Sequence, residues 1–250
     1  MSNCARFADA PIADGGTPVE EWLQWRPPLP ALRLEQCPGL VVVAPHPDDE
    51  TLGFGAAASE IAAHGVDVHT VIASDGDRAW PDLSTAEQAA LAELRRYESH
   101  CAAILLELPR PSFLGLPDGD LTAHESRLAD LLTDLLAERG AGTWCAATWR
   151  GDGHPDHEAV GRAAATATSR TGAVLLEYPV WMWHWAQPGD PDVPWERAAR
   201  IASEPGAMQR KQRAVQAFHS QLTPHGVGRE AILPAHVVTR LHRVGEVVFR

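Results

Sequence analysis

The chain has 250 residues and a mass of 27.0 kDa, with 45% hydrophobic and 22% charged residues, which is ordinary for a globular protein that buries a full core. Its formal net charge of -12 and the absence of a basic stripe argue against nucleic-acid binding. No apolar run has the length of a membrane-spanning helix, and residues 1–20 do not resemble a secretory signal. We therefore expect no integral membrane segment and a cytoplasmic location.

The order of apolar and amphipathic segments along the chain favours an α/β fold. Residues 1–38, which are rich in Pro and polar residues, are predicted to be an extension wrapped on the surface of a single domain at 39–250. Within that domain, short apolar runs alternate with segments of helical periodicity. This alternation predicts a doubly wound, mostly parallel sheet with helices on both faces.

The individual elements follow from local signals. The run 40–44 is short, apolar and β-branched, as in a strand buried on both faces. Ser84 and Glu87 match a capping box at the start of a long helix, and Gly65 and Gly140 are placed to end helices. Strands are predicted at 40–44, 66–73, 113–114, 143–149 and 173–178, helices at 49–64, 84–106, 125–139, 157–169 and 206–222, and a loop at 181–195. The segment 237–249 fits a strand or a helix, and the sequence does not decide between them.

Polar side chains follow two of the predicted strands directly. His46, Asp48 and Asp49 come after the strand at 40–44, and His157 follows the strand at 143–149 after a short turn. Open α/β folds place their ligands beyond the carboxyl ends of parallel strands. We therefore expect two histidines and a carboxylate to converge at one edge of the sheet.

Two imidazoles and one carboxylate, with a fourth position left to water, form a zinc site of the catalytic type. Zinc lowers the pKa of that water toward ~7, and a second carboxylate within reach can take its proton. The adjacent aspartates supply one group for each role, and His154, if cationic, could stabilise an oxyanion. Taken alone, an Asp pair at a helix start is more often a cap worth roughly 0.3–1 kcal/mol. Two similar His/Asp clusters after two strands favour the metal site.

The motifs that carry this chemistry also resemble a known family. Pro-His-Pro-Asp-Asp-Glu at 45–50 and His-Pro-Asp-His at 154–157 resemble the PIG-L or LmbE-like deacetylases, and the likeness extends over roughly 40–222 through the segments 95–98, 116–120 and 211–221. The resemblance implies a Rossmann-like, three-layer α/β/α fold and hydrolysis of an N-acetyl group on a glucosamine-containing molecule. By motif position it implies one Zn²⁺ ion per chain held by His46, Asp49 and His157, with Asp48 as general base and His154 as oxyanion stabiliser.

Three further polar residues are predicted to lie on the substrate side of the site. The resemblance suggests that Arg95 contacts substrate hydroxyls, and the alternative is a surface pair with Glu98, three positions later on the same helix. Asp118 could orient a catalytic histidine or form a turn. Asp152 stands where some relatives acting on sugar–inositol substrates carry Tyr. This departure makes a mycothiol-type substrate less favoured and leaves the general acid open, with Asp48 as the alternative donor to the leaving amine.

The tryptophans of the predicted loop have two interpretations. Trp181 and Trp183, with Trp185 close by, follow the end of a strand and could form an aromatic wall for a sugar or an acyl group. The alternative is a cluster that buries a long loop.

From the sequence alone, the protein is interpreted as a zinc-dependent N-deacetylase with a small-molecule amino-sugar substrate. One alternative is a metal-dependent hydrolase of a carbamoyl or longer acyl amide, because another divalent metal and another acyl group suit the same residues. Another is a non-catalytic sugar-binding module. The sequence leaves a homo-oligomer open.

Overall fold

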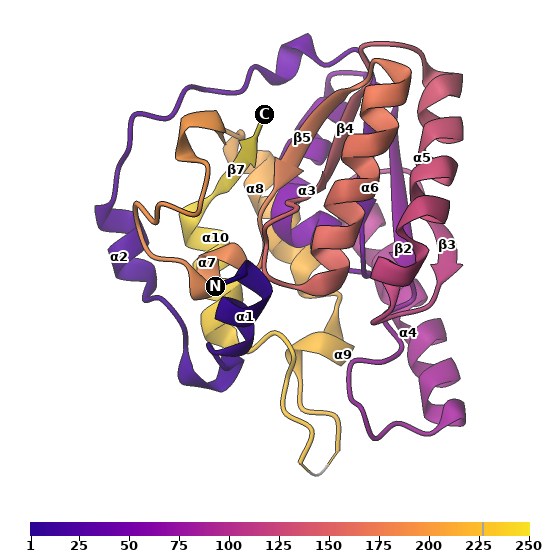
Figure 1. The fold of residues 1–250 in the computed structure, drawn as a ribbon, viewed down its shortest axis with the longest axis vertical. Helices are drawn as coiled ribbons and strands as arrows, with labels where there is room; N and C mark the ends of the chain where they lie inside the picture. The colour runs from indigo at the N-terminus through magenta and orange to yellow at the C-terminus, as the bar shows by residue number, and fades with distance from the viewer. Residues whose placement is uncertain (227) are drawn as a thin grey trace.

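A seven-stranded mixed sheet forms the centre of the protein in the computed structural model, which describes residues 1–226 and 228–250. The strand order is β3-β2-β1-β4-β5-β7-β6, and the first five strands are parallel (Figure 1). β7 is antiparallel to both β5 and β6. The strands are β1 (Leu40–Ala44), β2 (Val68–Ser74), β3 (Ser112–Leu116), β4 (Trp144–Thr148), β5 (Val174–Tyr178), β6 (Ala198–Ile201) and β7 (Glu246–Phe249).

Helices cover both faces of the sheet, as predicted for a doubly wound fold. The larger ones are α3 (Asp49–Ala63), α4 (Thr85–Leu105), α5 (Glu125–Arg139), α6 (Pro155–Thr171), α8 (Pro205–Val215) and α10 (Ala235–Val244). The short ones are α1 (Asn3–Ala8), α2 (Val19–Gln24), α7 (Met182–Trp185) and α9 (His219–Leu222), with single 3₁₀ turns at Ile12–Asp14, Leu34–Gln36, Leu121–His124 and Trp195–Arg197. None of the helices in the described part of the chain is both long enough and apolar enough to span a bilayer.

The strand β1 shows why the sheet is buried on both sides. Leu40 and Val42 point into the core shared with α3, while Val41 and Val43 point into the core under α5 and α6. Successive side chains of a strand point to opposite faces, so a wholly apolar strand needs a cover on each. The sequence-based strand at 40–44 and helix at 125–139 are confirmed with the same bounds, and Ser84 and Glu87 form the predicted capping box.

The structure corrects two predicted segments and resolves a third that the sequence left undecided. The helix predicted at 206–222 is two helices, α8 and α9, because Phe218 turns into a separate core with Ala102 and Leu106. The loop predicted at 181–195 contains α7. The undecided segment 237–249 holds both alternatives in succession, since Gly245, at φ +77°, ends α10 and β7 follows. The strand β6 was not predicted.

Residues 1–38 run along the β6 and β7 side of the sheet (Figure 1). Trp22 is buried in the core beside Trp183, and Leu32 donates its backbone N–H to the carbonyl of Arg200 in β6. The segment therefore contributes to the core as well as to the surface. The division at residue 38 stays a prediction.

Candidate metal centre

Two loops at the carboxyl edge of the sheet carry the predicted reactive residues. β1 ends at Ala44 and α3 begins at Asp49, while β4 ends at Thr148 and α6 begins at Pro155. Because β1 and β4 are adjacent and parallel, both loops emerge at the same edge. Asp48 caps α3 with φ at +131°, a conformation costing roughly 1–3 kcal/mol that concentrates at functional sites.

The structure brings three potential ligand atoms together. His46 Nδ1 lies 3.1 Å and His157 Nε2 lies 3.3 Å from the same oxygen, Oδ2 of Asp49. The three atoms lie within 4.8 Å of one another. His157 Nε2 is buried and forms no hydrogen bond within 1–226 or 228–250, although it lies 3.3 Å from Asp49 Oδ2. A buried nitrogen without a partner is costly unless a ligand binds it, so these residues fit a divalent metal ion.

A second group of potential ligands, His46 with Asp118 and Asp156, has another explanation. His46 Nε2 lies 3.1 Å from Asp118 and 3.3 Å from Asp156. Both carboxylates already accept backbone N–H groups: Asp156 accepts those of Gly119 and Leu121, and Asp118 accepts that of Arg78. These carboxylates therefore orient the imidazole, so that Nδ1 faces the metal position. Of the two alternatives for Asp118, the structure favours orientation of a histidine.

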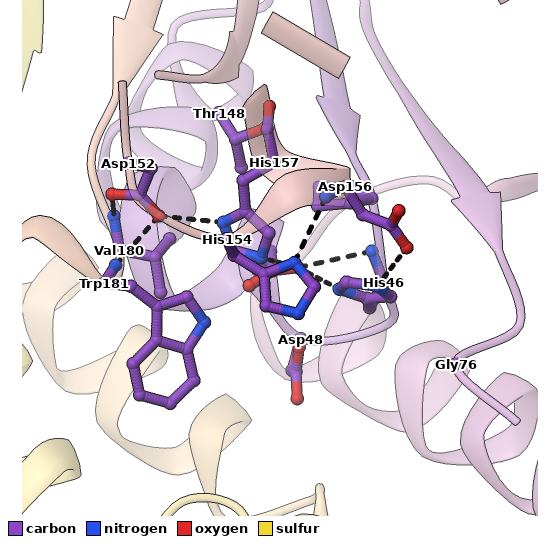
Figure 2. A network of polar contacts seen from close by, with 12 residues as sticks. His46, Asp48, Gly76, Thr148, Asp152, His154, Asp156, His157, Val180 and Trp181 are labelled. Carbon is purple, nitrogen blue, oxygen red and sulfur yellow. Dashed lines mark hydrogen bonds and ion pairs between the residues drawn. The ribbon is translucent and has the colours of Figure 1, made fainter. Parts of the chain in front are cut away.

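Asp152 is placed differently from the substrate contact that the sequence suggested. It is fully buried and lies behind His157, as Figure 2 shows, with Oδ2 2.8 Å from His157 Nδ1. Its oxygens also accept the backbone N–H groups of Val180, Trp181 and Met182, each at 2.9 Å. This carboxylate fixes the ring of His157 with Nε2 toward the metal position, and it has no open face for a substrate.

Arg95 is buried beside Asp48 and is not a surface residue. Its guanidinium donates to Asp48 Oδ2 at 3.1 Å and to the carbonyls of Pro47 and Gly76. Gly76 has φ +63°, and a Cβ there would lie 2.0 Å from Arg95 Nη1. The alternative pair with Glu98 does not form, because Glu98 is buried and accepts two hydrogen bonds from Ser220.

Burial and opposite charges shift the pKa values of this cluster strongly. Burial lowers the pKa of His157, but the charges of Asp49 and Asp152 outweigh this and raise it to about 9. Burial raises the pKa of Asp48 to about 8, and Arg95 opposes the shift while the neighbouring carboxylates add to it. The carboxylates that favour a proton on His157 also favour a metal cation in its place.

His154 lies at the entrance of the same cluster. Its ring centre is 5.2 Å from that of His46 and 4.9 Å from that of His157. Its Nδ1 accepts the N–H of Asp156, so the ring proton lies on Nε2. Burial, followed by the charges of His157 and His46, lowers the pKa of His154 to about 3. A neutral His154 donates one hydrogen bond from Nε2, in place of the cationic form considered from the sequence.

A cavity of about 310 Å³ opens beside these residues. It is lined by His46, Asp48, Asp49, His154, Arg95 and Asp118 on its polar side, and by Trp181 among its apolar groups. Trp183 instead packs on Trp22 at 4.9 Å between ring centres and accepts its indole N–H with the backbone carbonyl. Each of the two interpretations of the tryptophans therefore holds for one residue. Trp181 lines the cavity, and Trp183 helps to bury the loop.

Sequence reasoning missed several residues of this region. Asp156 lies inside the motif at 154–157, so its carboxylate could have been assigned from the motif. Phe7, Ile12, Gln221, Ile232 and Leu233 also line the cavity. Gln221 ends the segment 211–221 that resembles the family, so that likeness could have pointed to it, whereas no local pattern marks the four apolar residues.

Comparisons with known proteins agree with this geometry. A family model described as "PIG-L: GlcNAc-PI de-N-acetylase" matches residues 41–168, just over half of the chain, and this range contains both motifs. The diacetylchitobiose deacetylase of Thermococcus kodakarensis is 26% identical over 134 residues, which are 53% of this chain and 50% of the relative. The chain thus matches about half the length of that relative.

Two further similarities span more of the chain. The 1D-myo-inositol 2-acetamido-2-deoxy-alpha-D-glucopyranoside deacetylase of Rhodococcus erythropolis is 27% identical, over 80% of this chain and 86% of the relative. The solved structure of N,N'-diacetylchitobiose deacetylase from Pyrococcus horikoshii has a TM-score of 0.59 at 20% identity, over 76% of this chain and 72% of that one. This similarity shows the three-layer α/β/α fold.

Proposed function

Because this chain belongs to the PIG-L family of de-N-acetylases, we propose that it is a zinc-dependent hydrolase that removes an N-acetyl group from a glucosamine-containing small molecule. The observation that carries the proposal is the cluster of His46 Nδ1, His157 Nε2 and Asp49 Oδ2, three potential ligand atoms that lie within 4.8 Å of one another beside a cavity. Zinc suits two imidazoles and one carboxylate, and other divalent ions are alternatives.

The residues around the cavity suit hydrolysis of an amide. A divalent ion held by His46, Asp49 and His157 supplies Lewis-acid polarisation when bound. Asp48, which Arg95 fixes and a bound cation would favour in its ionised form, takes a proton from the attacking water as its oxygen bonds to the carbonyl carbon. His154 donates from Nε2 to the developing oxyanion. Asp48 then returns the proton to the nitrogen as the C–N bond breaks, giving acetate and a free amine.

Two other functions use the same fold. A carbamoyl or longer acyl amide would react by the same steps, and turnover of acetyl and longer acyl analogues separates these substrates. A sugar-binding module would need no base, so the buried and oriented Asp48 supports the enzyme.

The direct test is release of acetate from a panel of N-acetylglucosamine conjugates by protein with zinc restored. We expect release that a chelator abolishes and zinc returns, and about one zinc ion per chain by elemental analysis of protein purified without added metal. No release from any conjugate would overturn the proposed substrate class. Cell fractionation and light scattering test the cytoplasmic location and the homo-oligomer, which remain predictions.

A further inference from the structure

The cavity beside the metal ligands has a polar side and an apolar side that come from different parts of the chain. All its candidate metal and catalytic residues lie within the family match at 41–168. Much of the apolar side lies outside that match and comprises Phe7, Ile12, Trp181, Ile232 and Leu233. The reactive residues of the family match therefore face a set of apolar residues that lie in the rest of this chain. We call these five apolar residues the wall of the cavity.

Phe7 of α1 brings this wall close to His154. Its ring centre lies 5.2 Å from that of Trp181 and 6.3 Å from that of His154. Gly153, next to His154, has no room for a side chain, because an added Cβ would lie 2.8 Å from Cβ of Phe7. The helix α1 thus packs directly on the loop that carries His154.

Several contacts hold residues 1–17 in this position. Asn3 donates to the carbonyl of Gly151 at 2.8 Å, and Arg6 pairs with Asp190 while its guanidinium lies 4.4 Å from the ring centre of Trp185. Thr17 donates its N–H to the carbonyl of His184 at 2.9 Å. These contacts fix the segment to both the 151 loop and α7, so Phe7 faces the cavity in a defined position.

We propose that the N-terminal segment determines specificity, because Phe7, Ile12 and Trp181 form a subsite for an apolar substituent carried next to the scissile amide. The inference rests on the proposed function and narrows its substrate to an amphipathic N-acyl amino sugar. The substituent is an alkyl or aryl group, and it belongs to either the aglycone or the acyl chain. Each methylene buried on the wall favours binding by about fourfold.

The first test compares three substrates: the methyl and hexyl β-glycosides of N-acetylglucosamine, and the methyl glycoside of N-hexanoylglucosamine. We expect at least one of the two substrates with a six-carbon chain to exceed the methyl glycoside of N-acetylglucosamine in kcat/KM by about tenfold or more, mainly through a lower KM. The substrate that does so identifies the source of the apolar group. Phe7→Ala should reduce this preference about tenfold, and Phe7→Leu should largely keep it. Tyr97→Ala, which truncates an exposed aromatic residue outside this cavity, is the matched control.

The second test needs no activity. Metal-free wild type and Phe7→Ala are titrated by calorimetry with hexyl and methyl β-glucosaminide and with N-hexanoylglucosamine. Hexyl-dependent binding that Phe7→Ala weakens supports the subsite even if no substrate is deacetylated, which would overturn only the proposed function. Deacetylation with the same methyl-to-hexyl ratio in wild type and Phe7→Ala would overturn the subsite and leave the proposed function intact.

Discussion

The polar edge and the apolar wall of the cavity are built in opposite ways. His46, Asp49 and His157 lie shortly after the ends of two adjacent parallel strands, in the connecting loops or the first turns of the helices that follow. The local segment therefore places each of these side chains. The wall residues Phe7 and Leu233 line the same cavity only because segments far apart in the sequence pack together. The edge is thus set by local sequence and the wall by tertiary packing.

This difference separates chemistry from selectivity. Changes at the edge should alter turnover of every substrate, whereas changes at the wall should alter the ranking of substrates. A variant at the polar edge that changed only the ranking of substrates, and not the turnover of all of them, would contradict this separation.

The largest expected effect is that of Asp48→Asn. Asparagine keeps the shape of the side chain but accepts no proton from water, and loss of a general base costs about 10²- to 10⁴-fold in rate. We expect kcat to fall by that factor for all substrates while the zinc content stays near that of wild type. Asp134→Asn, on an exposed position of α5, should match wild type. Activity of Asp48→Asn within tenfold of wild type would exclude Asp48 as the base.

Metal binding should also be visible in stability. Zinc at 100 times its dissociation constant stabilises the folded state by about 2.7 kcal/mol, or about 5–10 °C in Tm for a chain of this size. We expect this increase when zinc is added to chelator-treated wild type, measured by calorimetry. His157→Ala removes one ligand and should lose most of the increase. An equal increase in both proteins would place the zinc elsewhere.

Asp152→Asn tests whether the carboxylate behind His157 orients this candidate metal ligand. Asn cannot accept at both oxygens, so a hydrogen bond to His157 or to the backbone at 180–182 is lost. We expect zinc affinity to fall about 10- to 100-fold and the free energy of unfolding to fall by about 1–3 kcal/mol. Competition with a chromophoric chelator measures the affinity, with the exposed Asp192→Asn as control. Unchanged affinity would show that Asp152 has no role in orienting His157.

The position of Asp152 illustrates how much the sequence could predict. The five parallel strands, the main helices and the convergence of His46, Asp49 and His157 follow from apolar periodicity and from strand ends that share one edge. The burial of Asp152 depends on three N–H groups that lie 28 to 30 residues later. Neither that contact nor the approach of Phe7 leaves a periodic or motif signal, because both arise when distant segments pack.

Gly76→Ala and Gly115→Ala form a pair that isolates the support of Asp48. Both glycines have φ near +62°, so alanine costs each about 1–2 kcal/mol of stability. A Cβ at Gly76 meets Arg95 at 2.0 Å, while at Gly115 it meets open space. We expect Gly76→Ala to lose more stability in urea unfolding, because the buried Arg95 must shift away from its hydrogen-bond partners, and to lose about tenfold in kcat, whereas Gly115→Ala should keep its kcat. Equal kcat values would mean that Arg95 does not need to hold Asp48.

The smallest expected effect on selectivity is at the anchor of the wall. Arg6→Met keeps an apolar stem over Trp185 but leaves the buried Asp190 without its charged partner, so the free energy of unfolding should fall by about 1–3 kcal/mol. The preference for hexyl over methyl glycosides should change by less than about threefold, since the packing of Phe7 on Gly153 and Trp181 remains. Arg33→Met, whose pair with Glu35 is exposed, is the matched control within residues 1–38 and should leave both quantities unchanged. If Arg6→Met removed the preference as fully as Phe7→Ala, the wall would be held by charge rather than by packing.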